Sequence, residues 1–463
     1  MVSNILRNCQ YRGRGYFSFR EILIFLIFVF FTFNICGSKN IVKGGEIAFN
    51  KNDTVLIVAP HPDYEVLANA NVMIDALKNG SQVYVVFVTS GEHNTDTMLK
   101  FAPIPIISSY LLAYRRYREA IASEKIIGVT SDHLIFLGFP DFGMMKILTN
   151  PNKDYFSGIT LRKRVFESWS IDKGKPYNLT IAYTALKDVF LKVKPTKVFY
   201  PSPYDLNPDH RAVSVLTQAV LKEINNPGIQ TFTYFVHAKG YPNPLGYFPT
   251  RTLKFPNFFM IKPEGTFYNL DLERSDISKK YKAVKAHKSQ YLTKPKFMLS
   301  FVRRNEVFFV ENPLKLNMQL PLWDKSIMSK LGITPFVEKA KLGADSEHYD
   351  IQFTLFKGTP RFSKINIFLY PVKSGSEFLN MPKYRIEIER DFSNKLALKL
   401  FDKDKEVLTT FENLSGSSTE LDFDIKINKS YFDGADCLFL MFSFEQFDVR
   451  VTETPWFCID ILN

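Results

Sequence analysis

Two short segments of the chain combine histidine with carboxylates, and each directly follows a predicted strand. The first is APHPDYE, which contains His61 and Asp63. The second is PSPYDLNPDHR, which contains Asp209 and His210. Neutral imidazole and carboxylate groups together suit zinc or a similar divalent ion. The same residues can also cap the helices that follow, and spacing alone leaves both interpretations open.

The elements around these segments alternate between strand and helix. The apolar run Thr54–Ala59 is typical of a strand buried on both faces of a parallel sheet. Further strands are predicted at Val83–Val88, Leu134–Leu137, Lys197–Tyr200 and Phe232–Val236. Helices are predicted at Glu65–Lys78, Tyr114–Ile127, Ile181–Val193 and Pro208–Glu223. This alternation predicts an α/β fold with a Rossmann-like, mostly parallel sheet and helices on both faces. Such sheets bind ligands at the carboxyl ends of their strands, where both segments lie.

After about residue 335 the pattern changes to short apolar runs separated by turn residues, without helical periodicity. The runs are His348–Phe356, Ile365–Val372, Tyr384–Ile388, Leu396–Phe401, Leu421–Ile427, Cys437–Phe444 and Trp456–Ile461. Several of them alternate apolar and polar residues, as strands with one buried face do. We therefore predict an all-β sandwich domain at residues 336–463. Two cysteines, Cys437 and Cys458, are expected to lie in neighbouring elements of it.

The N-terminus has the features of a targeting segment. Four arginines precede Ile22–Phe31, an unbroken apolar run that is short for a complete membrane span. Residues 1–37 are therefore predicted to form a signal peptide or a signal anchor. The basic flank should stay in the cytoplasm, so the globular part would be exported, either secreted or anchored to the membrane. A buried core element is the alternative interpretation of this run.

Composition excludes several classes of protein. The chain has 463 residues, of which 46% are hydrophobic and 23% charged, so it is neither a disordered chain nor a fibrous rod. Four cysteines without a C-x-x-C pair exclude a disulfide scaffold and a zinc ribbon. The net charge is +12, but the basic residues are scattered and no nucleic-acid reader motif occurs. We expect no nucleic-acid partner. A glycine-rich phosphate loop is also missing from the sequence, which disfavours nucleotide binding.

The two segments resemble motifs of the PIG-L/LmbE family of zinc-dependent N-acetylglucosaminyl deacetylases. APHPDYE resembles the His-Pro-Asp-Asp-Glu motif, and NPDH resembles the His-Pro-Asp-His motif. Other landmarks follow in the family's order at Val88–Glu92, Arg116 with Glu119, Phe136–Asp141, Tyr234–His237, Lys285–Gln290 and Phe301–Glu306. The resemblance spans about residues 53–310. It implies a deacetylase domain, which we place at residues 38–325.

The resemblance implies catalytic roles for the matching residues. His61 and His210 would be zinc ligands. Asp63 would be the general base that takes a proton from the attacking water, and Asp209 would be a supporting carboxylate.

Further residues would form the substrate pocket. By the same resemblance, Arg116, Glu119 and Asp141 would bind substrate, although ordinary salt bridges explain these three residues equally well. His237 and His287 receive no chemical role.

Two positions depart from the family's pattern. Tyr64 stands where the family has an aspartate, its third zinc ligand, and Asn207 stands where it has an oxyanion-stabilising histidine. The amide of Asn207 can still donate a hydrogen bond to an oxyanion. A phenol has a pKa of about 10 and coordinates zinc only if the metal lowers that pKa. Tyr64 is therefore a doubtful third ligand, and we expect zinc to bind weakly.

Two functional hypotheses follow. The first is an exported, metal-dependent hydrolase that removes the acetyl group from an N-acetylated amino sugar or glycoconjugate. The second is a catalytically degenerate relative that keeps the fold and acts as a glycan-binding or scaffold protein. In both, the N-terminal segment would make the contact with the membrane, and the zinc content of the purified protein would separate the two hypotheses.

Overall fold

The computed structural model describes residues 45–462, except for 94–104, 258–262, 326–327, 329–334, 360–363, 391–395, 411 and 447–448. The predicted targeting segment at residues 1–37 lies outside the described residues and stays a prediction. Among the helices that are described, none combines the length and the apolar character needed to cross a membrane.

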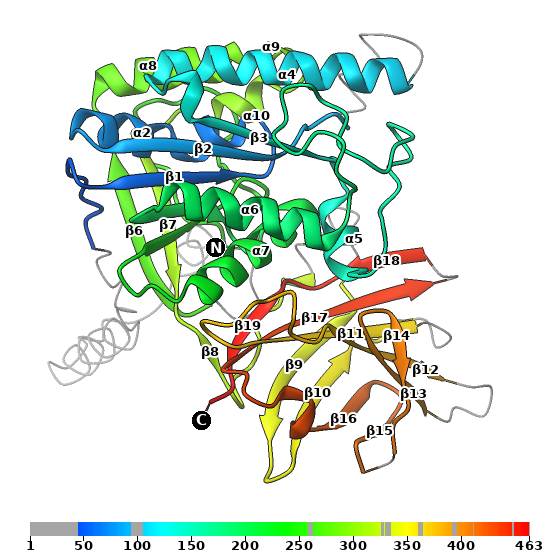
Figure 1. Cartoon of the computed structure of the whole chain (residues 1–463). Coiled ribbons are helices and arrows are strands. Elements are labelled where there is room, and N and C mark those ends of the chain that lie inside the picture. The colour runs from blue at the N-terminus through cyan, green and yellow to red at the C-terminus, as the bar shows by residue number, and fades with distance from the viewer. Residues whose placement is uncertain are drawn as a thin grey trace, which may run out of the picture. The chain divides into compact units, whose positions relative to one another are not determined.

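A seven-stranded sheet forms the centre of the first part of the chain (Figure 1). Its strands are β1 (Thr54–Ala59), β2 (Gln82–Thr89), β3 (Leu134–Phe139), β4 (Lys197–Pro201), β5 (Gln230–Tyr234), β6 (Gly265–Asp271) and β7 (Asn305–Glu311). Their order is β3-β2-β1-β4-β5-β7-β6, with the first five parallel and the pairs of β7 antiparallel. The predicted mostly parallel sheet is confirmed, whereas the antiparallel edge of β6 and β7 was not predicted.

Helices cover both faces of this sheet, as predicted. They are α2 (Tyr64–Lys78), α4 (Pro105–Ile127), α5 (Met144–Thr149), α6 (Leu179–Val193), α7 (Pro208–Ile224), α8 (Arg274–Ala286), α9 (Lys288–Tyr291) and α10 (Pro295–Leu299). In β1, Val55 and Ile57 pack in one core with α2, while Leu56 and Val58 pack in another with α6 and α7. Burial on both sides explains why β1 is apolar throughout. Figure 1 shows α4 and α8 on one side of the sheet and α6 and α7 on the other.

The second part of the chain is built mainly from antiparallel strands. They are β8 (Leu314–Lys315), β9 (Val337–Ala344), β10 (His348–Leu355), β11 (Lys364–Val372), β12 (Tyr384–Arg390), β13 (Leu396–Asp402), β14 (Lys405–Val407), β15 (Leu414–Ser418), β16 (Asp422–Asn428), β17 (Cys437–Gln446), β18 (Val449–Glu453) and β19 (Phe457–Asp460). One sheet has the order β15-β16-β10-β9 and the other β14-β13-β12-β11-β17-β19-β8, with β18 beside β17. The rings of Phe353 and Phe442 meet 5.1 Å apart between the two sheets, which confirms the predicted sandwich.

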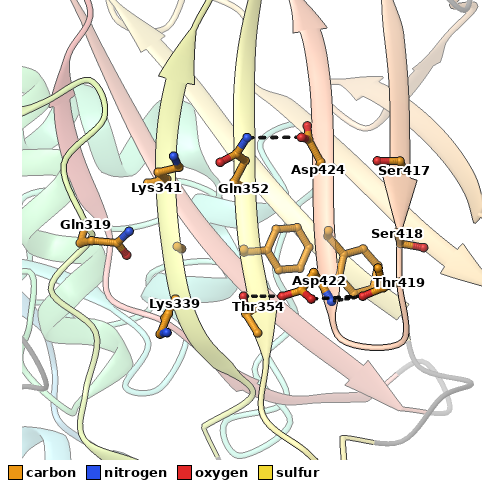
Figure 2. A pocket seen from close by; sticks show the side chains of 13 residues that line it. Gln319, Lys339, Lys341, Gln352, Thr354, Ser417, Ser418, Thr419, Asp422 and Asp424 are labelled. Atoms are coloured by element: carbon orange, nitrogen blue, oxygen red, sulfur yellow. Dashed lines mark hydrogen bonds between the residues drawn. The ribbon is translucent and has the colours of Figure 1, made fainter.

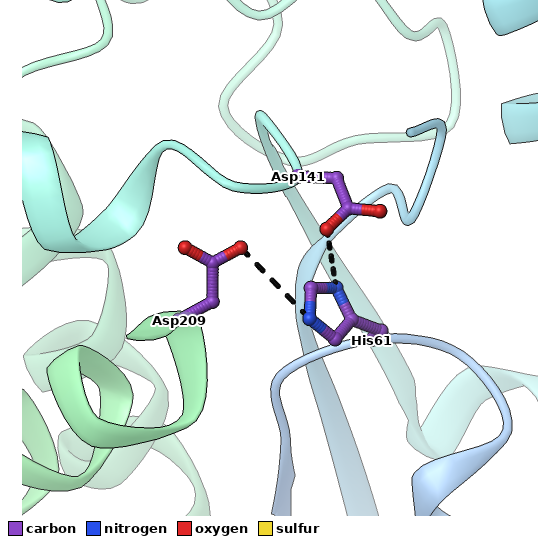
Figure 3. A group of neighbouring side chains, drawn as sticks. All are labelled: His61, Asp141 and Asp209. Atoms are coloured by element: carbon purple, nitrogen blue, oxygen red, sulfur yellow. Dashed lines mark ion pairs between the residues drawn. The ribbon is translucent and has the colours of Figure 1, made fainter. Parts of the chain in front are cut away.

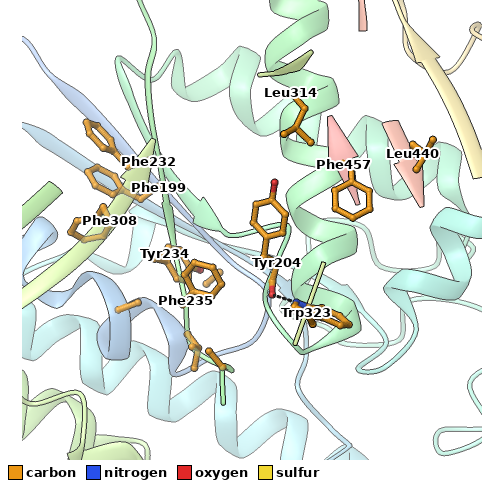
Figure 4. Close-up of a cluster of buried hydrophobic side chains, with 14 of the residues drawn as sticks. Phe199, Tyr204, Phe232, Tyr234, Phe235, Phe308, Leu314, Trp323, Leu440 and Phe457 are labelled. Carbon is orange, nitrogen blue, oxygen red and sulfur yellow. Dashed lines mark hydrogen bonds between the residues drawn. The ribbon is translucent and has the colours of Figure 1, made fainter. Parts of the chain in front are cut away.

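Strand β17 is apolar on both sides because the larger sheet is covered twice. Leu440 and Phe442 face the core of the sandwich, whereas Phe439 and Met441 face α5, α6 and α7. A cluster of buried aromatic side chains joins residues of both parts, and in it Trp323 Nε1 donates to the Tyr204 carbonyl at 3.2 Å (Figure 4).

The predicted domain boundaries remain a prediction. Strand β8 lies within the predicted residues 38–325, yet it pairs in parallel with β19 of the sandwich.

The smaller sheet of the sandwich has a polar outer face (Figure 2). Inward-pointing Phe353 and Phe423 alternate with polar residues, as expected for a sheet with one solvated side. A cavity of about 410 Å³ lies on this face and is lined by Lys341, Gln352 and Asp424, among others. Gln352 Nε2 donates to Asp424 Oδ2 across the strands at 3.3 Å.

We predict that Cys437 and Cys458 form a disulfide in an oxidising environment. They lie on the paired strands β17 and β19, with their sulfur atoms in contact at 2.7 Å. The bond would join two residues that are 21 positions apart in the sequence. Closing a loop of that size stabilises a fold by ~3 kcal/mol. Reduction should therefore lower the melting temperature of the wild type but not of Cys437→Ser. Peptide mapping after alkylation of the unreduced protein contradicts the prediction if both thiols are modified.

Candidate functional site

The candidate site lies at the carboxyl ends of β1 and β4, which pair in parallel. From β1 the chain continues to β2 and β3 on one side of the sheet, whereas from β4 it continues to β5 on the other side. The strand order therefore reverses between β1 and β4. A reversal of this kind opens a crevice outside the strand ends, where α/β proteins bind ligands. The turns after these two strands bring both histidine-carboxylate segments to this crevice.

The two histidines proposed as zinc ligands lie side by side. The ring centroids of His61 and His210 are 5.5 Å apart, and both side chains are buried. His61 Nδ1 lies 2.6 Å from Thr89 Oγ1, and its Nε2 has no hydrogen-bond partner among the described residues. Within that same part of the chain, His210 Nε2 also lacks a partner. Buried ring nitrogens are seldom left unpaired, so these two atoms fit a missing ligand such as a metal ion.

Asp205 holds His210 in place, a role that the sequence interpretation missed. Its Oδ2 lies 3.3 Å from His210 Nδ1 and accepts the backbone N–H groups of Val236 and His237, while Oδ1 accepts that of Asn207. Burial alone would raise the pKa of Asp205, but the neighbouring imidazoles and backbone N–H groups lower it to about 2. An ionised carboxylate behind a metal-binding imidazole fixes the orientation of the ring. Its position five residues before His210, in the same turn, was the available signal.

Two carboxylates lie beside His61 (Figure 3). Asp141 Oδ1 is 3.4 Å from His61 Nδ1, and Asp209 Oδ2 is 3.8 Å from His61 Nε2. One potential ligand atom from each of the three residues lies within 4.8 Å of the others. Asp209 also accepts the N–H groups of Phe142 and Met144, at 2.5 and 2.9 Å. Burial raises the pKa of both carboxyl groups, so a nearby cation would favour their ionised forms.

Tyr64 packs among the histidines. Its ring lies edge-on to His210, with centroids 4.6 Å apart, and its hydroxyl is 2.8 Å from His237 Nε2. Burial raises the pKa of Tyr64 well above its ordinary value, so the group is a neutral phenol. His237 is also neutral, because burial lowers its pKa to about 4, and its ring stacks on Phe297. The structure thus brings His237, which had no role in the sequence interpretation, into the site.

Asp63, the residue proposed as the general base, is held by Arg116. Arg116 Nη2 donates to Asp63 Oδ1 at 2.9 Å and to the Pro62 carbonyl, while Nη1 donates to the Gly91 carbonyl at 2.7 Å. Burial raises the pKa of Asp63 to about 7, although the charge of Arg116 acts in the opposite direction. A carboxylate with a pKa near neutrality is suited to proton transfer. Asp63 also has a backbone φ of 115°, which is unusual for a non-glycine residue.

A buried ion pair supports this backbone conformation. Glu65 Oε2 accepts the Asp63 N–H at 2.7 Å, and Glu65 Oε1 lies 2.9 Å from His287 Nε2. Both partners are fully buried. Burial alone would lower the pKa of His287, but the adjacent Glu65 carboxylate outweighs it, so the pKa of the imidazole is raised. The sequence interpretation assigned no role to either residue.

Several of these groups line a cavity of about 280 Å³, whereas His210 and Asp209 lie behind its wall and are not among the lining residues. Its lining residues are His61, Asp63, Tyr64, His93, Arg116, Asp141, Phe142, Asn207, His237, Gln290, Lys294, Phe297 and Met298. The Asn207 side-chain oxygen accepts the Asp209 N–H at 2.9 Å and so caps α7. Glu119, expected in the substrate pocket, lies outside this lining. Its carboxylate instead accepts hydrogen bonds from the backbone N–H and the hydroxyl of Ser289.

Comparison with known proteins identifies the class of this domain. Residues 56–221 match the model of the PIG-L family, described as GlcNAc-PI de-N-acetylase. Residues 56–221 are therefore identified as a PIG-L domain, and the resemblance inferred from the motifs is confirmed over that range. The family match supports a hydrolytic deacetylase function. No curated protein matches the chain.

Several solved structures share weak similarity with the chain. N,N'-diacetylchitobiose deacetylase from Pyrococcus horikoshii is 18% identical, with a TM-score of 0.36, over 65% of this chain and 95% of its own. A40926 pseudoaglycone deacetylase is 15% identical, with a TM-score of 0.37, over 56% and 97%. The 4-carboxy-2-hydroxymuconate hydratase from Pseudomonas putida is 16% identical, with a TM-score of 0.34, over 54% and 83%. At these TM-scores the similarities carry no argument about chemistry.

We predict that Glu65 and His287 are energetically coupled. His287→Leu leaves the Glu65 carboxylate buried without its counter-charge, which should cost ~3 kcal/mol of unfolding free energy. Adding Glu65→Gln removes that unpaired charge and should recover most of the loss. Urea unfolding of the wild type, both single variants and the double variant measures the coupling. Strictly additive losses would show that the two side chains do not depend on one another.

Proposed function

We propose that this chain is a metal-dependent hydrolase that removes the acetyl group from an N-acetylated amino sugar. The observation that carries the proposal is the convergence of His61 and Asp63 on one cavity at the reversal of strand order, with the His210 ring beside that of His61. The PIG-L match supports the deacetylase class, and the unpaired buried nitrogens of His61 and His210 support a metal. The donor set of imidazoles and carboxylates is compatible with zinc.

In this proposal His61 and His210 would hold the metal, and Asp141 and Asp209 are the nearest carboxylates to His61. When bound, zinc supplies Lewis-acid polarisation of the acetyl carbonyl and activates water for attack. Tyr64 stands in place of the family's third ligand. Because a neutral phenol lacks the charge of a carboxylate, we expect the metal to bind more weakly than with aspartate.

The residues of the chain then carry the proton and position the substrate. Asp63 takes a proton from the attacking water as its oxygen bonds to the carbonyl carbon. It then gives that proton to the amine nitrogen as the C–N bond breaks, which releases acetate and the free amino sugar. The Asn207 NH₂ group donates to the oxyanion, because its side-chain oxygen is already engaged with Asp209 N–H. Arg116 and Asp141 line the cavity and would orient the sugar.

A degenerate, glycan-binding relative is the second candidate. The observation that favours it is the Tyr64 ring against His210, with its hydroxyl directed to His237. Such a site would keep its sugar pocket but would have a neutral phenol in place of the family's charged third ligand. Activity and metal content together separate the two candidates.

Replacement of Tyr64 tests the role of the third ligand. Tyr64→Asp should tighten zinc binding by more than about tenfold, because even outer-shell partners of a metal commonly contribute that much. It should also raise acetate release from a panel of N-acetylated sugars. Tyr64→Phe is the matched control, since it removes the hydroxyl without adding a carboxylate. Asp63→Asn in the Tyr64→Asp background should abolish turnover but leave zinc bound.

The results distinguish the candidates directly. If the native protein already binds zinc tightly and Tyr64→Asp weakens it, Tyr64 is itself a ligand. If neither the native protein nor Tyr64→Asp binds metal or releases acetate, the glycan-binding candidate replaces the enzyme.

We also propose that the globular part is exported, with residues 1–37 as the targeting segment. The support is the arrangement of four arginines ahead of the apolar run Ile22–Phe31. A C-terminal tag should be digested by protease added to the outer side of the membrane of intact cells. A tag protected from the protease, beside a digested exported control protein, would overturn this proposal.

A further inference from the structure

Exposed apolar side chains gather in two segments beside the candidate site. Seventeen large apolar side chains are exposed in the described chain, and eight of them lie in these segments, so their distribution is uneven. The first half of α4 contributes Ile106, Ile107, Tyr110, Leu111 and Tyr114. The loop before α6 contributes Phe156, Leu161 and Ile171. An exposed apolar cluster of this kind is typical of an interaction surface.

Aromatic contacts join the two segments into one surface. The ring of Tyr110 lies 5.6 Å from that of Phe166, and Tyr114 lies 5.5 Å from Trp169. Trp169 also stacks on Tyr117 of α4, with ring centroids 4.8 Å apart. We call residues 106–118 together with 156–175 the basic apolar face.

The charges on this face are of one sign. Arg118 on α4 and Arg162, Lys163, Arg164 and Lys173 on the loop are exposed. The only acidic residues within these two stretches are Glu167 and Asp172, and both are buried. Glu167 accepts a hydrogen bond from Ser90, and Asp172 pairs with Lys175 at 2.6 Å. Within residues 106–118 and 156–175, every exposed charged side chain is therefore a cation, and the exposed Asp154 just before the loop accepts a hydrogen bond from Asn178.

The basic apolar face borders the candidate site. Arg116 projects from the other side of the same stretch of α4 and binds Asp63. The bond from Ser90 Oγ to Glu167 Oε1, 2.5 Å long, connects the loop to the end of β2. A partner on this face would therefore lie close to the cavity.

We propose that the basic apolar face docks on the surface of an anionic lipid bilayer. Apolar tips that enter the interface and cations that contact acidic headgroups are the two contributions that bind peripheral proteins to membranes. A protein partner fits less well, because Lys is depleted in protein interfaces, although Arg is enriched there, and because the exposed charges within these stretches are of one sign only, as an anionic lipid surface would attract. Docking would hold the cavity next to substrates at the membrane. The proposal does not depend on the chemistry assigned to the site.

Trp169 provides a local probe of this contact. It is partly exposed on the face, whereas Trp323 and Trp456 are buried in the cores. The purified full chain is mixed with vesicles that carry bromine on their acyl chains, which quenches tryptophan at short range. Vesicles of phosphatidylglycerol and phosphatidylcholine should quench the emission, vesicles of phosphatidylcholine alone should quench it less, and Trp169→Phe should remove the effect. Attachment through the N-terminal segment alone leaves Trp169 unquenched.

Two sets of variants test the face itself. The double variant Leu111→Glu with Ile171→Glu should bind vesicles more weakly, because it loses apolar burial and adds negative charge. The lipid concentration needed for half-maximal quenching should rise about tenfold. Leu191→Glu with Leu245→Glu, which changes two leucines elsewhere that are each more exposed than Leu111, should have no effect. Arg162→Glu with Lys163→Glu should abolish the preference for anionic vesicles.

Three results would overturn the proposal. The first is that anionic vesicles do not quench Trp169. The second is that they quench it equally in the wild type and in the double variant Leu111→Glu with Ile171→Glu. Alternatively, sedimentation could show that the wild type self-associates and that this variant does not, in which case the face is an interface between two copies of the chain.

Discussion

The pairing of β1 with β4 is the constraint on which the candidate site depends. Each strand ends in a turn that carries one of the two histidines, and only neighbouring strands bring those turns together. Asp53 at the start of β1 ties the opposite ends of these strands, because its carboxylate binds Lys197 Nζ at 2.6 Å and Thr196 Oγ1 at 2.8 Å. A slip of this pair would separate His61 from His210 by several ångströms, since each residue adds about 3.3 Å along a strand.

Local sequence patterns were sufficient to predict most of the α/β sheet. Val55–Ala59 of β1 is an unbroken apolar run because both faces of the strand are buried, and the same holds for Cys437–Phe442 of β17 in the sandwich, so length and flanking turns identify these strands without knowledge of their partners. The antiparallel edge of β6 and β7 was not predicted. Strand β6 is half-exposed, and its sequence GTFYNLD lacks a continuous apolar run. Long-range pairing, rather than local pattern, determines such a strand.

The candidate site could be predicted only where a motif held the information. His61, Asp63 and His210 were found through the turns that contain them, but Asp205, Glu65 and His287 act through contacts across the fold. His287 lies on the segment between α8 and α9, far from Glu65 in the chain, and meets it only after folding. Glu119 shows the opposite case, since its place in a motif suggested substrate binding, whereas its hydrogen bonds are with Ser289 and Arg115. A motif gives residue types and order, whereas burial and distance decide which group faces the cavity.

The balance of charge in the site indicates where a cation is needed. Arg116 compensates Asp63, His287 compensates Glu65, and three backbone N–H groups together with His210 stabilise Asp205. Among the described residues no Lys or Arg forms an ion pair with Asp141 or Asp209; burial raises the pKa of both carboxyl groups, although the charge of Arg116 acts in the opposite direction on Asp141. The ring of Tyr64 also lies beside His61, with centroids 5.3 Å apart, but as a neutral phenol it adds no charge to the site. A divalent ion in this site would therefore be attracted most strongly toward Asp141 and Asp209, because buried carboxylates gain most from a nearby positive charge.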